Sequence, residues 1–301
     1  MKGFIVYPTY EVIDDQTYIQ LFGRLENGKS FVTINKIEPY FFITEDDAKK
    51  LPKFISKCTI TPIDLVNFQG KKVVKVSAKN HLDLNKFSEY LHKKGINTYE
   101  ADIKPQFRFI IDNNLLGMIN IEGDSESSER VDLVFKEPKI TPTEFNPELK
   151  IVSLDTESNK ETGELFCIGL YSKNYKKNFM ITNHKIKDTV SCESEEECLR
   201  KFRDEIIKID PDIITGWSLV DFDLKSLQER FKKYKIPFDI GRTNDNVRIK
   251  IEDNFFRSSS ADIPGRQVLD ALSLVRDPFI QEAPSIKNAE FETYTLEDVS
   301  Q

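Results

Sequence analysis

The feature that most constrains how this chain can fold is residues 151–157, which read IVSLDTE. Four mostly apolar residues lead directly into two carboxylates, a pattern typical of a buried strand whose end opens into a charged site. Because side chains alternate along a strand, Asp155 and Glu157 share a face. Two acidic groups at this spacing repel each other unless one is protonated or a cation lies between them. Their oxygens are hard ligands that favour Mg²⁺ or Mn²⁺.

A plainer interpretation of an Asp-x-Glu tripeptide is a pair of exposed charges at a strand end, since such tripeptides are common. The elements that follow favour a site instead. Residues 164–171 and 177–182 predict two more strands of an antiparallel meander. Residues 194–197 form a capping-box pattern that begins a helix, and a short apolar strand over 212–217 follows, parallel to the first. This order predicts a ribonuclease H-like fold.

Asp223 is the third acidic residue of the predicted site. It lies in the first turn of a helix expected after the strand over 212–217. An acid in a first turn also suits the helix dipole by about 0.3–1 kcal/mol, so by itself it fits ordinary N-terminal charge. In a ribonuclease H-like arrangement, however, it lies near Asp155 and Glu157, and we expect it to be a third metal ligand.

Residues 1–145 predict a separate, small α+β domain, in which short strands alternate with helices such as the one over 82–94. Residues 122–148 are rich in small, acidic and proline residues and predict a linker, to which residues 131–135 could add a strand. A chain of 301 residues suits two domains. We therefore expect an α+β domain over 1–145 and an α/β, ribonuclease H-like domain over 146–301.

The charge of the chain does not decide its partner. A net charge of −7 argues against nucleic acid, because phosphate binding draws on Lys and Arg. The acidic excess lies mainly beyond residue 145, where 23 basic residues face 29 acidic ones, and a site that meets phosphates through bound cations needs such an excess. No stretch approaches the roughly 20 apolar residues of a membrane span, and no signal peptide is expected. We expect a cytoplasmic protein.

The cysteines and histidines do not predict a zinc site. The four cysteines include no C-x-x-C pair, and the chain has only three histidines. We expect reduced thiols, in keeping with a reducing compartment. His81, His92 and His184 lie in polar segments, which predicts surface positions for all three.

Several short motifs resemble those of family B DNA polymerases, most closely in the form that bacterial members carry. Residues 154–157 and 163–170 are similar to the family's first exonuclease motif, and residues 211–223 to its second. Further landmarks follow in the family's order, so the resemblance covers nearly the whole chain, and several ordered motifs are far more specific than any one. These landmarks are residues 240–242, 265–270 and 294–297 and, in the N-terminal domain, 38–41 and 99–103.

The resemblance implies a 3′–5′ proofreading exonuclease. Asp155, Glu157 and Asp223 would be its catalytic residues and would hold two divalent ions, Mg²⁺ or Mn²⁺. Two ions about 3.5–4 Å apart can activate a water and stabilise the leaving 3′ oxygen of a DNA strand, so such a site needs several carboxylates and no covalent nucleophile. We expect the loss of any one ligand to remove most of the activity.

The resemblance also implies how DNA is bound. Leu154, Ser218 and Phe222 would belong to the substrate site, with Leu154 and Phe222 packed beneath it. Aromatic residues suit frayed terminal bases, because stacking tolerates any sequence. The implied partners are a single-stranded 3′ end and, in the complete enzyme, a primer–template and deoxynucleotides for DNA replication or repair. The resemblance further allows a sliding clamp.

The chain departs from the family pattern in two places. The second motif usually has Asn where this chain has Ser218, which shortens the side chain available for a polar contact. The third motif, a Tyr followed four residues later by a fourth metal-binding Asp, is absent. Asp270 and Asp298 are the late acidic candidates, and Asp298 better fits a capping box begun by Thr295. We therefore expect an N-terminal fragment of a DNA polymerase, with a weak or inactive exonuclease and no polymerase activity of its own.

Two other hypotheses remain open. A chain with this fold but too few ligands could be a noncatalytic module that binds single-stranded nucleic acid or a partner protein. A self-contained exonuclease of the same fold is disfavoured by the missing fourth carboxylate. Metal titration separates the first hypothesis from an enzyme, because a true site should bind Mn²⁺ and lose it on Asp155→Ala.

Overall fold

The computed structural model describes residues 1–52, 56–252, 259–283, 291 and 293–300 of the chain. The chain divides into two compact units, Met1–Pro147 and Glu148–Gln301, a division two residues beyond the one expected from the sequence. Each unit has its own buried cores and is described by itself. No helix within the described ranges is both long enough and apolar enough to cross a membrane.

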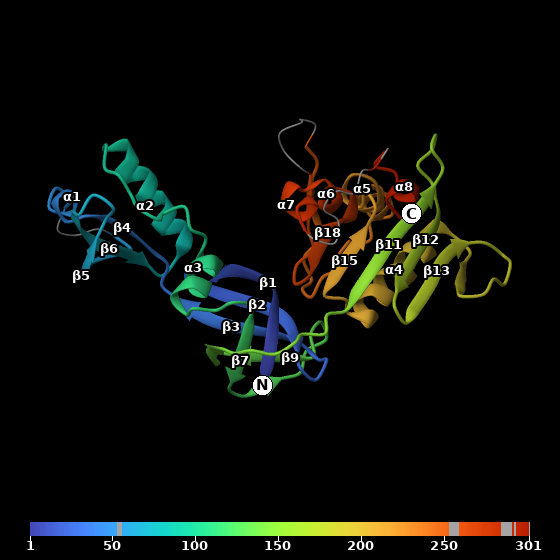
Figure 1. The fold of residues 1–301 in the computed structure, drawn as a ribbon, viewed down its shortest axis with the longest axis horizontal. Helices are drawn as coiled ribbons and strands as arrows, with labels where there is room; N and C mark the ends of the chain where they lie inside the picture. Colours follow the sequence, from blue (N-terminus) through green and yellow to red (C-terminus); the bar gives the residue numbers. More distant parts are fainter. Residues whose placement is uncertain (53–55, 253–258, 284–290, 292, 301) are drawn as a thin grey trace. The chain divides into compact units, whose positions relative to one another are not determined.

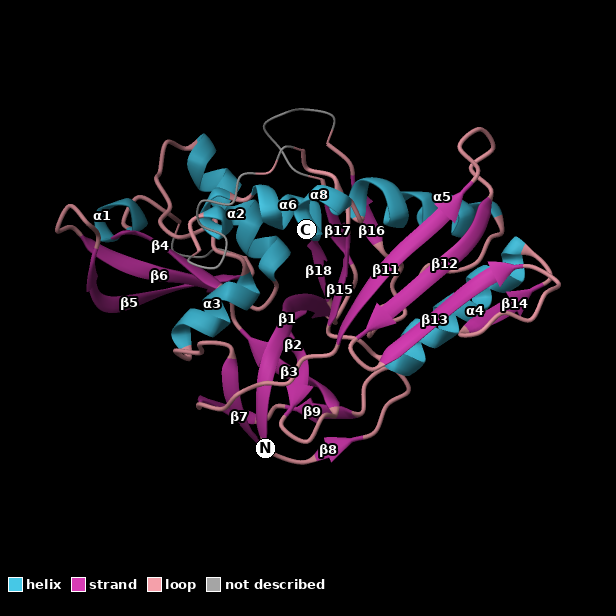
Figure 2. Ribbon diagram, turned by 45° about the vertical axis from the view of Figure 1, so that its right-hand side comes forward, coloured by secondary structure: helices cyan, strands magenta, loops and turns pink. Residues whose placement is uncertain are grey.

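A seven-stranded sheet with the order β10-β7-β1-β2-β3-β9-β8 forms much of the first unit (Figure 2). Its centre is the antiparallel meander β1–β2–β3, in which Ile19, Leu21 and Phe31 are fully buried. Gly28 turns the chain between β2 and β3 with a φ of 81°, which glycine adopts without strain. The strands are β1 (Lys2–Ile13), β2 (Gln16–Leu25), β3 (Ser30–Ile37), β7 (Met118–Glu122), β8 (Ser125–Glu126), β9 (Leu133–Lys136) and β10 (Lys139–Pro142).

A smaller antiparallel sheet with the order β4-β6-β5 carries one long helix on one face. The helix α2 begins after Asn80, whose side chain accepts the N–H of Leu82, and it buries Leu84 and Leu91 against the sheet. The elements here are β4 (Tyr40–Thr44), α1 (Glu45–Ala48), β5 (Cys58–Val66), β6 (Lys72–Ala78), α2 (His81–Lys93) and, after this sheet, α3 (Pro105–Asp112).

Two expectations for this unit are wrong. Residues 122–148 are not a linker throughout, because β9 pairs with β3, β8 pairs with β9 and β10 pairs with β7, so all three strands join the large sheet. Residues 127–132 and 143–148 lack regular structure. The strand that residues 131–135 were expected to add is present as β9. His81 is buried rather than on the surface, with its ring against Tyr10, and burial lowers the pKa of its imidazole because the charged form is poorly solvated there. His92 and His184 are exposed, as expected.

The second unit is built on a six-stranded sheet with the order β14-β13-β12-β11-β15-β18 (Figure 1). The strands β11, β12 and β13 form the expected antiparallel meander, and β15 lies parallel to β11, as the sequence predicted. This is the ribonuclease H-like order. The strands are β11 (Ile151–Ser158), β12 (Leu165–Ser172), β13 (Tyr175–Ile181), β14 (Thr189–Cys192), β15 (Ile213–Gly216) and β18 (Gln267–Asp270), with a separate pair β16 (Arg248–Lys250) and β17 (Ser260–Asp262).

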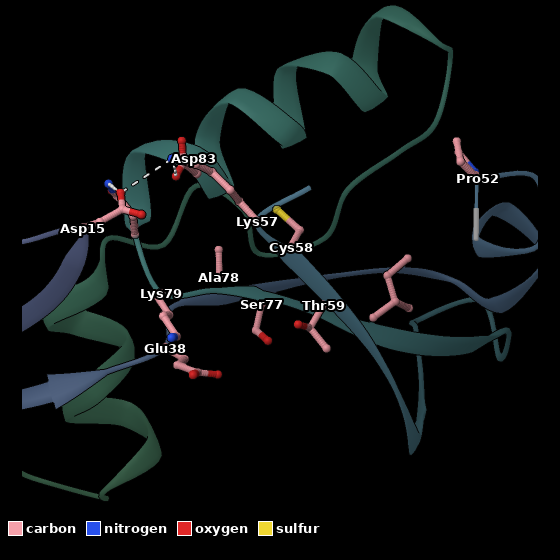
Figure 3. Close-up of a pocket in the computed structure, with 12 residues that line it drawn as sticks. Asp15, Glu38, Pro52, Lys57, Cys58, Thr59, Ser77, Ala78, Lys79 and Asp83 are labelled. Atoms are coloured by element: carbon pink, nitrogen blue, oxygen red, sulfur yellow. Dashed lines mark hydrogen bonds and ion pairs between the residues drawn. The ribbon is translucent and has the colours of Figure 1, made fainter. Parts of the chain in front are cut away.

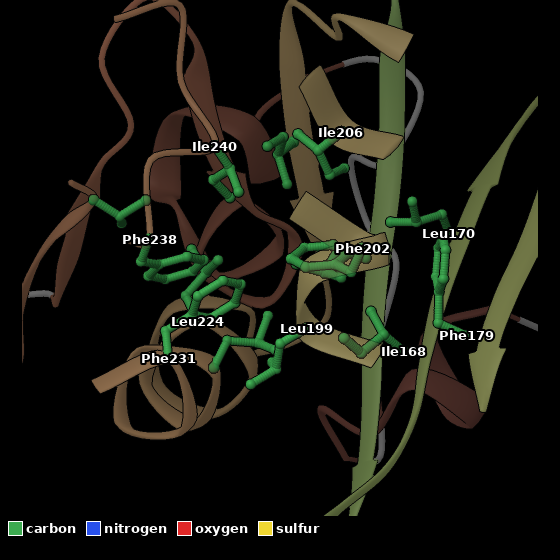
Figure 4. Packing of buried hydrophobic residues seen from close by; sticks show 14 of the residues in the cluster. Ile168, Leu170, Phe179, Leu199, Phe202, Ile206, Leu224, Phe231, Phe238 and Ile240 are labelled. Atoms are coloured by element: carbon green, nitrogen blue, oxygen red, sulfur yellow. The ribbon is translucent and has the colours of Figure 1, made fainter. Parts of the chain in front are cut away.

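Two helices cover one face of this sheet and bury its core. The helix α4 (Glu195–Ile209) begins after Ser194, whose side chain accepts the N–H of Glu197, as the capping-box pattern predicted. Figure 4 shows Phe202 of this helix between Phe179 of the sheet and Phe231, in a row of rings with centroids 6.5 Å and 6.4 Å apart. The other helices are α5 (Lys225–Lys233), α6 (Ala271–Arg276), α7 (Pro278–Gln281) and α8 (Leu296–Ser300). All four cysteines of the chain are free thiols, as expected.

Candidate metal centre

The candidate site lies where β15 stops pairing with β11. The two strands pair as far as Ser153 and Thr215, and the chain turns away after Gly216. Gly216 lies so close to β11 that a Cβ there would stand 2.5 Å from the carbonyl oxygen of Leu154, so only glycine fits. Beyond this point the backbone N–H of Thr156 has no strand partner on that side and donates to Asp223 instead.

Asp223 reaches β11 from a π-helical turn, Val220–Leu224, that directly precedes α5. The sequence had placed Asp223 in the first turn of an ordinary helix. The wider π turn, in which Leu224 donates to the carbonyl of Leu219, is a geometry often found at functional sites. Asp223 is only 1% exposed, and its Oδ1 accepts the N–H of Thr156 at 2.8 Å and the Thr156 hydroxyl at 2.7 Å.

Asp155 and Glu157 are exposed on the opposite face of β11 from the apolar Val152 and Leu154, so the predicted shared face is confirmed. Among the described residues, neither carboxylate forms a side-chain hydrogen bond or an ion pair. Burial raises the pKa of Asp223 to about 6; the negative charge of Asp155 contributes to this rise, and the hydrogen bonds from Thr156 oppose it. The negative charges of Asp155 and Asp223 therefore lie close together, and no cationic side chain in the described part of the chain pairs with them.

The chemistry of these side chains fits a hard divalent cation. Exposed carboxylates without protein partners are the ligands that Mg²⁺ and Mn²⁺ take, and a cation would relieve the repulsion between Asp155 and Asp223. Within the described ranges, however, no three His, Cys, Asp or Glu side chains are arranged closely enough to hold a metal ion. The structure thus brings Asp155 near Asp223, but the side chains of the three predicted ligands are not close enough together to coordinate one ion.

The residues expected to bind substrate separate into two groups. Leu154 is buried beneath the site, where we expected it. Phe222 does not pack beneath the site, because the π turn leaves its ring 54% exposed beside the buried Asp223. Ser218 is partly exposed and adopts a left-handed backbone with a φ of 55°, a conformation that Asn tolerates better than Ser.

The two late acidic residues have structural roles. Asp270, at the end of β18, accepts the N–H of Ser273 with one oxygen and the N–H of Val220 with the other, each at 3.1 Å. It therefore caps α6 and anchors the π turn at the same time. Thr295 accepts the N–H of Asp298 at 3.3 Å, which is the capping contact expected from the sequence.

Sequence reasoning missed Thr156 and the role of Asp270. Thr156 was passed over because it stands between the two carboxylates and alternates with them. The available signal was its polarity on a strand face whose other inward residues, Val152 and Leu154, are apolar. Nothing local in the sequence indicates the contact between Asp270 and Val220, because 50 residues separate them.

A hollow of about 640 Å³ in the first unit carries no comparable chemistry. Figure 3 shows Asp15, Lys57 and Asp83 gathered on one side of it, near the start of α2. The Lys57 ammonium pairs with Asp83 at 2.8 Å and with Asp15 at 3.7 Å. Because both carboxylates pair with this one ammonium, the cluster is an exposed structural ion-pair network.

The sequence comparisons find similarity to DNA polymerases. The family model described as DNA polymerase family B, exonuclease domain, matches residues 96–299. The chain is 26% identical to DNA polymerase II of Escherichia coli K12 over 311 residues, which cover 99% of this chain and 38% of that protein. It is also 26% identical to a DNA polymerase of Archaeoglobus fulgidus, with 90% of this chain and 34% of that protein covered. The chain thus spans less than two-fifths of the length of these relatives.

The fold has a counterpart among solved structures. The family B DNA polymerase from the archaeon Pyrobaculum calidifontis matches with a TM-score of 0.69 and 19% sequence identity. The match covers 91% of this chain and 37% of the archaeal chain. The chain therefore shares its fold with part of that polymerase.

Proposed function

The chain belongs to the exonuclease-domain family of the family B DNA polymerases, and from this premise we propose that it removes nucleotides from the 3′ end of DNA by metal-dependent phosphodiester hydrolysis. The observation that carries the proposal is the arrangement at the end of β11, where two unpartnered carboxylates lie beside a buried third one. A cluster of negative charge has a use at a phosphodiester only when cations are bound to it.

Asp155, Glu157 and Asp223 are the residues that would hold the metal. When bound, two Mg²⁺ or Mn²⁺ ions activate a water and stabilise the leaving 3′ oxygen. Asp155 and Glu157 offer exposed oxygens on a rigid strand, so they need no rearrangement to meet an ion from solution. Asp223 is held from behind by Thr156, which fixes where its charge lies.

Phe222, Leu154 and Ser218 would shape the substrate site. The exposed ring of Phe222 is adjacent in sequence to Asp223 and is available to stack on a terminal base, a contact that any of the four bases can make. Leu154 supports the strand from the buried side. Ser218 begins the turn that carries Phe222, since its carbonyl accepts the Phe222 N–H at 3.1 Å.

The relatives are more than twice as long as this chain, and the exonuclease match covers only part of them. We propose that the whole protein is a cytoplasmic DNA polymerase that extends a primer–template with deoxynucleotides and proofreads the new 3′ end. The partner of the described site is then a single-stranded DNA 3′ end, frayed from the duplex.

The test is degradation of a 5′-labelled single-stranded oligonucleotide with Mn²⁺, by this chain and by a longer chain from the same gene. We expect shortening from the 3′ end that EDTA and Asp155→Ala abolish. Asp221→Asn is the matched control, because Asp221 is exposed on the same π turn and contacts neither Thr156 nor Asp223 in the described hydrogen bonds. If neither chain shortens the oligonucleotide, the proposed function is wrong.

A noncatalytic module that binds single-stranded nucleic acid is the second candidate. It is favoured by the lack, within the described residues, of three acidic side chains closed around one point. Such a module would bind the oligonucleotide equally well in Mn²⁺ and in EDTA and would leave its length unchanged. The same gel distinguishes the two functions.

A further inference from the structure

Thr156 interrupts the apolar face of β11. Val152 and Leu154 on that face are each 1% exposed and pack in the core, whereas Thr156, 3% exposed, carries a hydroxyl into the same environment. A buried hydroxyl is tolerated only when it has a hydrogen-bond partner. Its partner is the Asp223 carboxylate at 2.7 Å.

The hydroxyl and the backbone N–H of Thr156 both end on Oδ1 of Asp223. Hydrogen bonds to an ionised group are the strong ones, and two donors on one oxygen restrict how the carboxylate can turn. The turn that carries Asp223 is a short π segment, and its far end is anchored by the bond from Val220 to Asp270. Thr156 is therefore the contact that fixes the acidic end of this turn against β11.

We propose that Thr156 is a positioning residue whose hydroxyl holds the Asp223 carboxylate in the orientation that binds a divalent ion together with Asp155. This inference deepens the proposed function and rests on it. Thr156 itself contacts neither metal nor DNA in this account. If the hydrogen bond from this hydroxyl had a structural role alone, its removal would lower stability and leave the metal affinity unchanged.

The test compares the Mn²⁺ affinity of Thr156→Val, which keeps the shape and loses the hydroxyl, with that of Thr156→Ser, which keeps the hydroxyl. Loss of a group that orients a metal ligand typically weakens metal binding about 10–100-fold, and we expect Thr156→Val to fall in that range. We expect Thr156→Ser to stay close to the wild-type affinity. Free Mn²⁺, counted by electron paramagnetic resonance, gives each value without any need for catalysis.

Thr215→Val is the matched control. The Thr215 hydroxyl also donates a 2.7 Å bond inside this sheet, but to the backbone carbonyl of Leu269 rather than to an acidic side chain. We expect this variant to lower the unfolding temperature and leave the Mn²⁺ affinity unchanged. A double-mutant cycle without metal checks the contact between Thr156 and Asp223. Thr156→Val should lower the unfolding temperature when it is made in the wild-type protein, and it should have little effect when it is made in Asp223→Ala.

The outcomes separate the two proposals. If the wild type binds Mn²⁺ and Thr156→Val binds it equally well, or if Thr156→Ser is as weak as Thr156→Val, the positioning role is overturned and the proposed function stands. If the wild type binds no Mn²⁺, the proposed function fails and the positioning role fails with it.

Discussion

Removal of one negative charge from the site should stabilise the metal-free protein. Asp223 is 1% exposed, and its carboxylate is desolvated by burial and repelled by Asp155. Asp223→Asn removes that charge and keeps an amide oxygen to accept the two donors of Thr156. Sites built for a ligand commonly sacrifice stability in this way, so a loss-of-function change can be stabilising.

The magnitude follows from the pKa. The Asp223 carboxyl has a pKa near 6 in the fold and 3.8 as its ordinary value, so the folded protein keeps a proton that the unfolded chain has lost between these pH values. The contribution of Asp223 to stability therefore falls as pH rises from about 4 to about 6. A rise from 3.8 to about 6 corresponds to about 3 kcal/mol. We expect Asp223→Asn to gain up to that amount at pH 7.5 in EDTA, and little at pH 4.

Urea unfolding gives this free energy directly. Trp217 is the single tryptophan of the chain and directly follows β15, so its fluorescence reports on the second unit. Asp221→Asn, at the exposed acid two positions away, controls for the change in net charge and should alter stability by less than about 0.5 kcal/mol. The reasoning is refuted if Asp223→Asn is no more stable than the wild type at pH 7.5, or if its gain is the same at pH 4.

Three further predictions concern the frame of the site. Gly216→Ala should lower the free energy of unfolding by about 2 kcal/mol, because its Cβ would meet the backbone of β11. The control Gly169→Ala, whose Cβ would lie 3.4 Å from its nearest neighbour, should be nearly neutral. Equal losses of free energy in urea unfolding would contradict this prediction. Ser218→Asn should stabilise by about 0.5 kcal/mol in the same melts, because Asn suits the left-handed backbone, and a loss would count against the strain. Arg230→Met should cost about 3 kcal/mol, because it removes the guanidinium from the buried Glu195 and leaves that carboxylate only the Leu165 N–H, the Tyr234 hydroxyl and Lys233 at 3.8 Å; a cost below about 1 kcal/mol would show that the pair is solvated.

The strand and its two carboxylates could be predicted from sequence because their signal is local. Asp155 and Glu157 follow an apolar run, and strand periodicity alone places them on one face. The sequence also predicted the parallel strand β15, because the helix before it makes that connection typical. These elements depend on residues close together in the chain.

The features that sequence did not reveal depend on contacts between distant segments. β9 overlaps the strand expected over 131–135, but the polar, proline-rich sequence does not indicate that β9 pairs with β3 or that β10 pairs with β7. The π turn forms because Asp270 holds its start and Thr156 holds Asp223, and both partners lie at least 50 residues away. Phe222 was expected beneath the site, but in the π turn it is 54% exposed.

The central claim is that Asp155, Glu157 and Asp223 bind divalent metal at the end of β11, and a crystal soaked in Mn²⁺ tests it most directly. We expect anomalous density within about 2.0–2.6 Å of carboxylate oxygens of Asp155 and Asp223, the range for hard divalent ions and oxygen ligands. This density should disappear in Asp155→Ala. A well-ordered site with no anomalous density at saturating Mn²⁺ would show that these residues do not bind divalent metal.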